Sequence, residues 1–122
     1  MKIFLTLSSA LALFLNSYAQ NLNTFHDYSG ETILGDSIDF SMFYGKKVLV
    51  VNTASYCSYT HQYADLEELY LNYNQYDFEI IGFPCNECIN QDPHDDSTIN
   101  DFCQTYNITF QMMSKIATVS AD

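Results

Sequence analysis

Apolar residues along this chain follow two spacings, and their alternation predicts alternating strands and helices. Residues 48–51 are a short, continuous apolar run rich in β-branched side chains, typical of a parallel strand buried on both faces, and residues 78–83 are predicted to form a second strand. Between them, apolar side chains recur every three or four residues from about residue 60 to 76, which predicts a helix with one buried face. That face would contain Tyr63, Leu66, Leu69, Tyr70 and Tyr73, with Glu67 and Glu68 on the opposite side.

Weaker patterns before and after these segments complete the predicted order of elements. Residues 32–38 place turn-forming residues between apolar ones, which predicts a short hairpin. An acidic or hydroxyl residue at 95–97 can cap a second helix that ends near residue 106. Residues 108–110 are expected to be extended, and 114–120 are the candidate for a last strand. Such alternation predicts one α/β domain with a mostly parallel sheet.

The first 19 residues are predicted to be a secretory signal peptide rather than part of the fold. Lys2 precedes an apolar stretch, residues 3–15, that is too short to span a membrane comfortably, and small residues predict cleavage before Gln20. Residues 20–122 would then form the folded domain of an exported protein, periplasmic or secreted. A buried N-terminal helix is the alternative interpretation.

The charge of the chain argues against several classes of partner. Its formal net charge is −11, with 15 acidic residues against four lysines. Nucleic acid and anionic membranes are therefore not expected as partners, because both are bound mainly by neutralising phosphate. An anionic substrate would find only Lys46, Lys47 and Lys115 in the predicted domain.

Cys57 occupies the position that looks best prepared for chemistry. A buried strand at 48–51 is followed by a small polar turn at 52–55, then by Cys57, and the predicted helix begins at about Thr60. Backbone N–H groups and the helix dipole at such a junction favour an anion, and the thiolate is the reactive form of a cysteine. An inert buried thiol is the alternative. Because position 60 is Thr, Cys57 is not part of a Cys-x-x-Cys dithiol.

The other cysteines are Cys85, Cys88 and Cys103, and the sequence leaves their pairing open. Four cysteines allow three complete pairings. Cys85 and Cys88 form a Cys-x-x-Cys that could be a local bridge, an extra redox pair or loop thiols. A zinc site that adds His94 to this pair fits no common ligand spacing. We expect neither a metal nor a cofactor.

Several segments resemble signatures of the glutathione peroxidases. The first is Asn-Thr-Ala-Ser-Tyr-Cys-Ser-Tyr-Thr at 52–60, in which Ser58 stands where the family usually has Gly. The others are Ile-Gly-Phe-Pro-Cys-Asn at 81–86, Gln-Asp-Pro at 91–93, Phe-Cys at 102–103 and residues 109–116. The likeness runs in register from about residue 25 to the C-terminus. It implies a thioredoxin-like fold with a central mixed sheet flanked by helices.

The resemblance also implies an activity, the reduction of hydrogen peroxide and organic hydroperoxides in defence against oxidative stress. Cys57 matches the family's nucleophile, which forms a sulfenic acid, and Gln91 matches its catalytic glutamine. Cys103 matches the segment that carries the resolving cysteine of thioredoxin-dependent members, although a packed helix cysteine is equally compatible. His61, where the family usually has Pro, could stabilise a thiolate or simply face solvent. The reductant would be a thioredoxin-like protein or glutathione.

The Trp and Asn that complete the family's active site have no match in this chain. The resemblance therefore implies a truncated domain that lacks the last strand and helix. Two other functions stay open from the sequence. The chain could be a non-catalytic fragment of such a peroxidase, or a thiol-disulfide exchanger that acts through Cys85 and Cys88.

Overall fold

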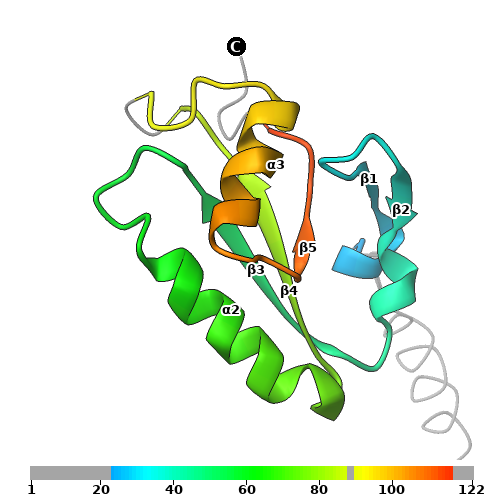
Figure 1. The fold of residues 1–122 in the computed structure, drawn as a ribbon. Helices are drawn as coiled ribbons and strands as arrows, with labels where there is room; N and C mark the ends of the chain where they lie inside the picture. Colours follow the sequence, from blue (N-terminus) through cyan, green and yellow to red (C-terminus); the bar gives the residue numbers. More distant parts are fainter. Residues whose placement is uncertain (1–22, 88–89, 117–122) are drawn as a thin grey trace, which may run out of the picture.

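The structure, a computed structural model, describes residues 23–87 and 90–116. The predicted signal peptide, residues 1–19, lies outside the described residues, as does Cys88. In chain order, the elements are η1 (Phe25–Asp27), β1 (Ser29–Glu31), β2 (Ser37–Asp39), η2 (Phe40–Phe43), β3 (Lys47–Thr53), α2 (Gln62–Tyr73), η3 (Asn74–Tyr76), β4 (Phe78–Pro84), α3 (Asp96–Thr105) and β5 (Gln111–Met112) (Figure 1). Among the described residues, no helix is long and apolar enough to cross a membrane.

A three-stranded parallel sheet in the order β3-β4-β5 forms the centre of the molecule. β3 and β4 pair along seven residues, from Lys47 opposite Phe78 to Thr53 opposite Pro84. The predicted hairpin is confirmed as a separate antiparallel pair, β1 and β2, joined by a turn in which Gly35 has a positive φ of 89°. The expected α/β domain with a mostly parallel sheet is therefore confirmed.

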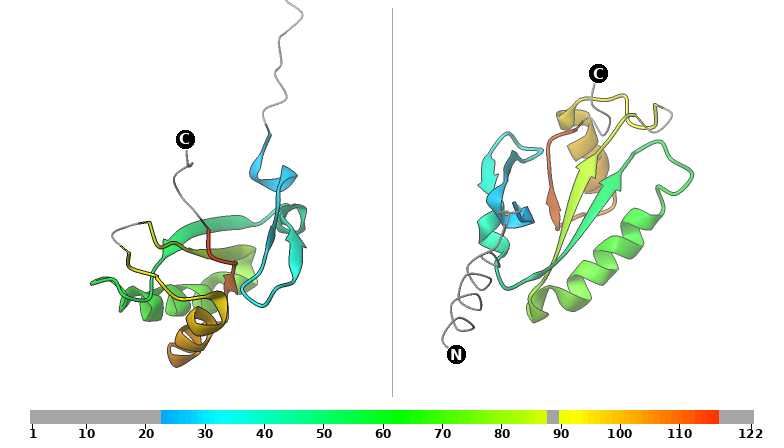
Figure 2. Two further views of the ribbon diagram at one scale, coloured as in Figure 1. Left: turned by 90° about the horizontal axis from the view of Figure 1, so that it is seen from above. Right: turned by 180° about the vertical axis from the view of Figure 1, so that it is seen from behind.

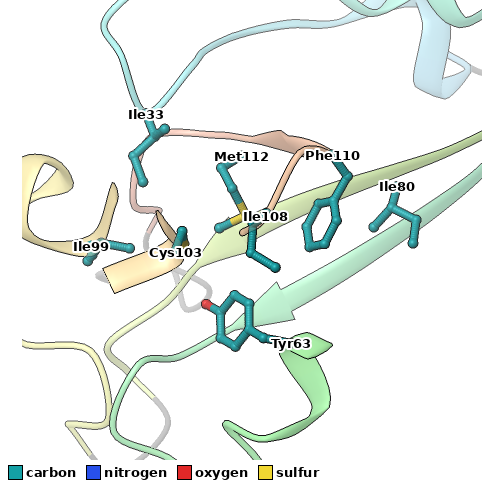
Figure 3. Packing of buried hydrophobic residues seen from close by; sticks show 8 residues of the cluster. All are labelled: Ile33, Tyr63, Ile80, Ile99, Cys103, Ile108, Phe110 and Met112. Carbon is teal, nitrogen blue, oxygen red and sulfur yellow. The ribbon is translucent and has the colours of Figure 1, made fainter. Parts of the chain in front are cut away.

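Both faces of the sheet carry apolar clusters, because neighbouring strand residues point to opposite sides. Ile80 belongs to the larger cluster, together with Tyr63 of α2 and Cys103 of α3 (Figure 3). Ile81 belongs to a second cluster, with two phenylalanines of η2. Figure 2 shows that α2 and α3 lie on the same side of the sheet.

The prediction that the strand at residues 48–51 is buried on both faces is wrong for β3, and β4 is the buried strand of the sheet. Ile80 and Ile81 are fully buried, whereas Val50 of β3 is 49% exposed. β3 has only one neighbouring strand among the described residues, so its side chains are covered from one direction. Asn52 and Thr53, expected in a turn, continue β3 instead.

The predicted face of α2 is confirmed at Tyr63, but the placement of Glu67 is wrong. Glu67 is 6% exposed and lies on the same face as Tyr63, four residues earlier. Its carboxylate accepts hydrogen bonds from the Thr109 backbone N–H, at 2.8 Å, and from the Thr109 hydroxyl. These bonds allow the charged side chain to be buried. Glu68 is exposed, as expected.

The start of α3 is confirmed, whereas the position of the last strand is not. Asp95 is the N-cap of α3, and its carboxylate accepts a hydrogen bond from the Thr98 N–H at 2.9 Å. The short strand that joins the sheet is β5, residues 111–112, earlier than the expected 114–120. Within 114–120, Ile116 forms one parallel bridge with Cys85, and residues 117–120 lie outside the described residues.

Candidate active site

A cavity of roughly 200 Å³ lies between the two loops that follow β3 and β4. Because these strands are parallel, their carboxyl ends reach the same edge of the sheet, and both loops begin there (Figure 1). The cavity brings together two of the predicted site residues, Cys57 and Gln91. None of the described residues that line it is charged; they are Val51, Asn52, Thr53, Ala54, Cys57, Tyr59, Thr60, Gln62, Tyr63, Leu66, Cys85 and Gln91.

Cys57 is half-buried in a tight turn that Thr60 holds in place. The Thr60 hydroxyl accepts a hydrogen bond from the Cys57 N–H at 2.9 Å and donates to the Cys57 carbonyl at 2.6 Å. The Tyr59 N–H donates a hydrogen bond to the Cys57 sulfur at 3.4 Å. α2 begins only at Gln62, two residues later than expected. The donor at the sulfur is therefore an amide of the turn rather than the first turn of the helix.

Gln91 is half-buried, and its side chain lines the same cavity. Its backbone carbonyl accepts a hydrogen bond from the Tyr56 N–H at 2.9 Å, so the two loops are joined next to the cysteine. No described residue makes a hydrogen bond to its carboxamide. This amide can therefore donate to a charge that develops in the cavity.

Asp92 and Ser55 form a buried pair that sequence reasoning missed. The Ser55 hydroxyl donates to Asp92 Oδ1 at 2.6 Å, and Asp92 is fully buried. Burial raises the pKa of Asp92, while the hydrogen bonds with Ser55 oppose that rise. The pair is adjacent in sequence to the site residues, because Ser55 precedes Cys57 by two residues and Asp92 follows Gln91. Their positions inside two signature segments were the only signal in the sequence.

Cys103 lies in the core rather than in the cavity. It is 1% exposed, and burial, together with the charge of Asp92, raises the pKa of its thiol to about 11. Tyr63 lines the cavity and belongs to the same core cluster as Cys103, and its hydroxyl points toward the side on which Cys103 lies (Figure 3). Burial also raises the pKa of Tyr63. Cys57 and Cys103 are both free thiols, so the structure does not join the nucleophile to its candidate resolving partner.

The remaining candidates contribute less to the site. His61 is exposed, and its Nδ1 lies 3.2 Å from the Ser58 carbonyl oxygen, which agrees with the solvent-facing interpretation. Cys85 is buried and lines the cavity. Among the described residues, no three histidine, cysteine or acidic side chains are grouped as metal ligands would be.

The family was determined by comparison with known proteins. The sequence model of the family described as "Glutathione peroxidase" matches residues 25–122. The chain belongs to the glutathione peroxidase family. Glutathione peroxidase from Lactococcus lactis subsp. cremoris (strain MG1363) is 46% identical over 93 residues, which are 75% of this chain and 59% of that protein. Glutathione peroxidase-like peroxiredoxin 2 from Saccharomyces cerevisiae is 46% identical over 76% of this chain and 58% of its own length.

Solved structures confirm the thioredoxin-like fold of this glutathione peroxidase chain. The crystal structure of Trgpx in apo form is 34% identical, with a TM-score of 0.61 over 82% of this chain and 58% of that one. A thiol:disulfide interchange protein of the thioredoxin family, from Chlorobium tepidum TLS, has a TM-score of 0.62 at 18% identity, over 73% of this chain and 57% of its own. The present chain thus spans a little over half the length of the proteins that it matches.

Proposed function

We propose that this chain provides the nucleophile of a cysteine-dependent thiol peroxidase. The observation that carries the proposal is the cavity that Cys57 and Gln91 share, with an amide N–H donated to the sulfur. The Cys57 thiolate attacks the terminal oxygen of a hydroperoxide, and the O–O bond breaks. Sulfur is oxidised to the sulfenic acid, and the departing alkoxide takes a proton to become an alcohol, or water when the substrate is hydrogen peroxide.

Gln91 would stabilise the charge that develops in this step. Its carboxamide donates without titrating, so the same hydrogen bond is available across the physiological pH range. Removing one such donor typically slows a reaction by about 100-fold or more. Gln91 therefore needs to be held at a fixed distance from the Cys57 sulfur.

Regeneration of Cys57 is proposed to use a thioredoxin-like protein rather than glutathione. No charged side chain lines the cavity within the described part of the chain, so the carboxylates of glutathione would find no cation among these residues. Cys103 would attack the Cys57 sulfenic acid, releasing water and forming a disulfide that a dithiol protein then reduces. Because Cys103 is in the core, α3 must open for this step.

We also propose that the protein works outside the cytoplasm. The proposal depends only on the pattern of the first 19 residues, a short apolar stretch followed by small residues before Gln20. N-terminal sequencing of the protein from its host tests it: a mature chain that begins at Gln20 supports export, and an intact Met1 contradicts it.

Trapping the sulfenic acid tests the peroxidase proposal. After one equivalent of hydrogen peroxide, a dimedone adduct on Cys57 is expected by peptide mass spectrometry, and Cys57→Ser should lose it. Gln91→Ala should form the adduct about 100-fold more slowly. Steady-state peroxide consumption with each donor then tests the reductant, and faster turnover with glutathione would reverse that choice. A wild-type chain that forms no adduct on Cys57 contradicts the peroxidase proposal itself.

A further inference from the structure

The two loops of the site are joined by two adjacent hydrogen bonds. Ser55 donates through its side chain to Asp92 at 2.6 Å, and Tyr56 donates through its backbone to Gln91 at 2.9 Å. Successive residues of one loop are thereby bound to successive residues of the other. Cys57 follows directly in the first loop. The separation of Cys57 and Gln91 is therefore set by this pair of bonds.

Asp92 is also anchored through its backbone. Its backbone N–H donates to the Asn86 side-chain oxygen at 3.0 Å, within the loop that follows β4. Its side chain is fully buried, and its second oxygen, Oδ2, has no hydrogen-bond partner among the described residues. An uncompensated buried carboxylate oxygen is costly. Because burying Asp92 in this way lowers the stability of the fold, Asp92 is a candidate for a role in the site rather than in stability.

We infer that Asp92 and Ser55 are positioning residues, whose hydrogen bond holds the Gln91 carboxamide in register with the Cys57 sulfur. The inference rests on the proposed function, because Gln91 and Cys57 are the groups that it positions. The essential group on Asp92 is the acceptor oxygen and not the negative charge. Removing either partner frees the Gln91 loop and slows the peroxide step without changing the thiol itself.

Five variants in the full chain separate these roles. Ser55→Ala and Asp92→Ala remove the bond, and both should oxidise Cys57 at least tenfold more slowly than the wild type. Asp92→Asn keeps an acceptor oxygen for Ser55 and removes the charge, and it should stay within about threefold of the wild type. Ser58→Ala is the matched control, because Ser58 is an exposed serine of the same turn whose hydroxyl bonds to no described residue. Ser55→Thr keeps a hydroxyl and should restore most of the rate.

Three further measurements distinguish positioning from simple loss of structure. Alkylation of Cys57 by iodoacetamide does not use Gln91, so its rate should not change in Ser55→Ala. In a Gln91→Ala background, Ser55→Ala should cause no further loss, because the bond acts through Gln91. Hydrogen exchange of the Tyr56 amide should accelerate at least tenfold in Ser55→Ala and Asp92→Ala.

The exchange measurement needs no peroxidase activity, so it tests the bond even if the proposed function fails. Three results would overturn the inference. One is unchanged Tyr56 exchange and unchanged Cys57 oxidation in both alanine variants. The second is an Asp92→Asn variant as slow as Asp92→Ala. The third is an equal loss of alkylation and oxidation. If an alanine variant does not fold, the test uses Asp92→Asn and Ser55→Thr instead. A large loss of the Cys57 oxidation rate in both variants would also overturn the inference.

Discussion

Cys103 is a single side chain whose ionisation the interior opposes. Its pKa rises from 9.0 to about 11, first because of burial and second because of the negative charge of Asp92. In the unfolded chain the thiol returns to its ordinary pKa. The folded protein therefore holds the Cys103 proton at pH values at which the unfolded chain has already released it.

This difference predicts that Cys103 makes stability fall with rising pH above about 9. Below pH 9 the thiol is protonated in both states, and its contribution is fully present. Between pH 9 and 11 the unfolded state binds fewer protons, so the free energy of unfolding declines, by about 1.4 kcal/mol per pH unit at most. Urea unfolding of the wild type and Cys103→Ala at pH 8 and pH 10 measures it. The difference between the two proteins should shrink by roughly 1 kcal/mol.

Taking the difference between the wild type and Cys103→Ala cancels contributions from other titratable groups, because those groups are present in both proteins. A difference between wild type and Cys103→Ala that is constant from pH 8 to pH 10 would contradict the prediction. A difference that grows with pH would show that the folded state favours the thiolate.

At the residue scale, the sequence predicts the reacting groups better than the residues that position them. Cys57 and Gln91 could be found because each belongs to a short signature. Ser55 and Asp92 lie in the same signatures, but the bond between them joins residues 37 positions apart. No local spacing predicts which hydroxyl meets which carboxylate across two loops. That information comes from the pairing of β3 with β4.

At the scale of elements, Glu67 joins α2 to the segment that leads into β5. Both hydrogen bonds to Thr109 end on its carboxylate. Glu67→Ala is expected to lower the free energy of unfolding by about 2 to 3 kcal/mol, because the two hydrogen bonds that Thr109 donates to this charged, buried carboxylate are lost. Glu68→Ala, which removes an exposed neighbour, should change it by less than about 0.5 kcal/mol. Urea unfolding of the two variants provides the comparison.

Equal effects of the two substitutions would show that the Glu67 carboxylate contributes nothing beyond helix propensity. Glu67→Gln gives a second check, because its amide oxygen still accepts one of the two hydrogen bonds. Its loss of stability should lie between those of Glu68→Ala and Glu67→Ala.

The elements differ in how far local sequence determines them. α3 was predicted closely, because Asp95 caps it and capping is a local interaction. β4 was predicted closely because apolar residues dominate its sequence. Glu67 was misplaced because its partner is 42 residues away. β5 was misplaced because a strand of two residues is defined by its neighbour, β4, rather than by its own pattern.

At the scale of the whole molecule, the strongest general feature is the excess of negative charge. The chain carries 15 acidic residues against four lysines. Among the described residues, only Lys46 and Glu79 form a salt bridge. Most of the described carboxylates therefore have no salt-bridge partner, and the excess of negative charge repels itself. This mutual repulsion is stronger in the compact state than in the expanded unfolded chain.

Salt is therefore expected to stabilise the protein. Raising sodium chloride from about 10 mM to about 150 mM shortens the screening length from roughly 30 Å to roughly 8 Å, which weakens repulsion between separated carboxylates. The urea concentration at the unfolding midpoint should rise over this range. Choline chloride should have the same effect, since screening does not depend on the cation. Stabilisation by sodium alone would indicate specific ion binding instead. A midpoint that falls with salt would show that attractive pairs such as Lys46–Glu79 outweigh the repulsion.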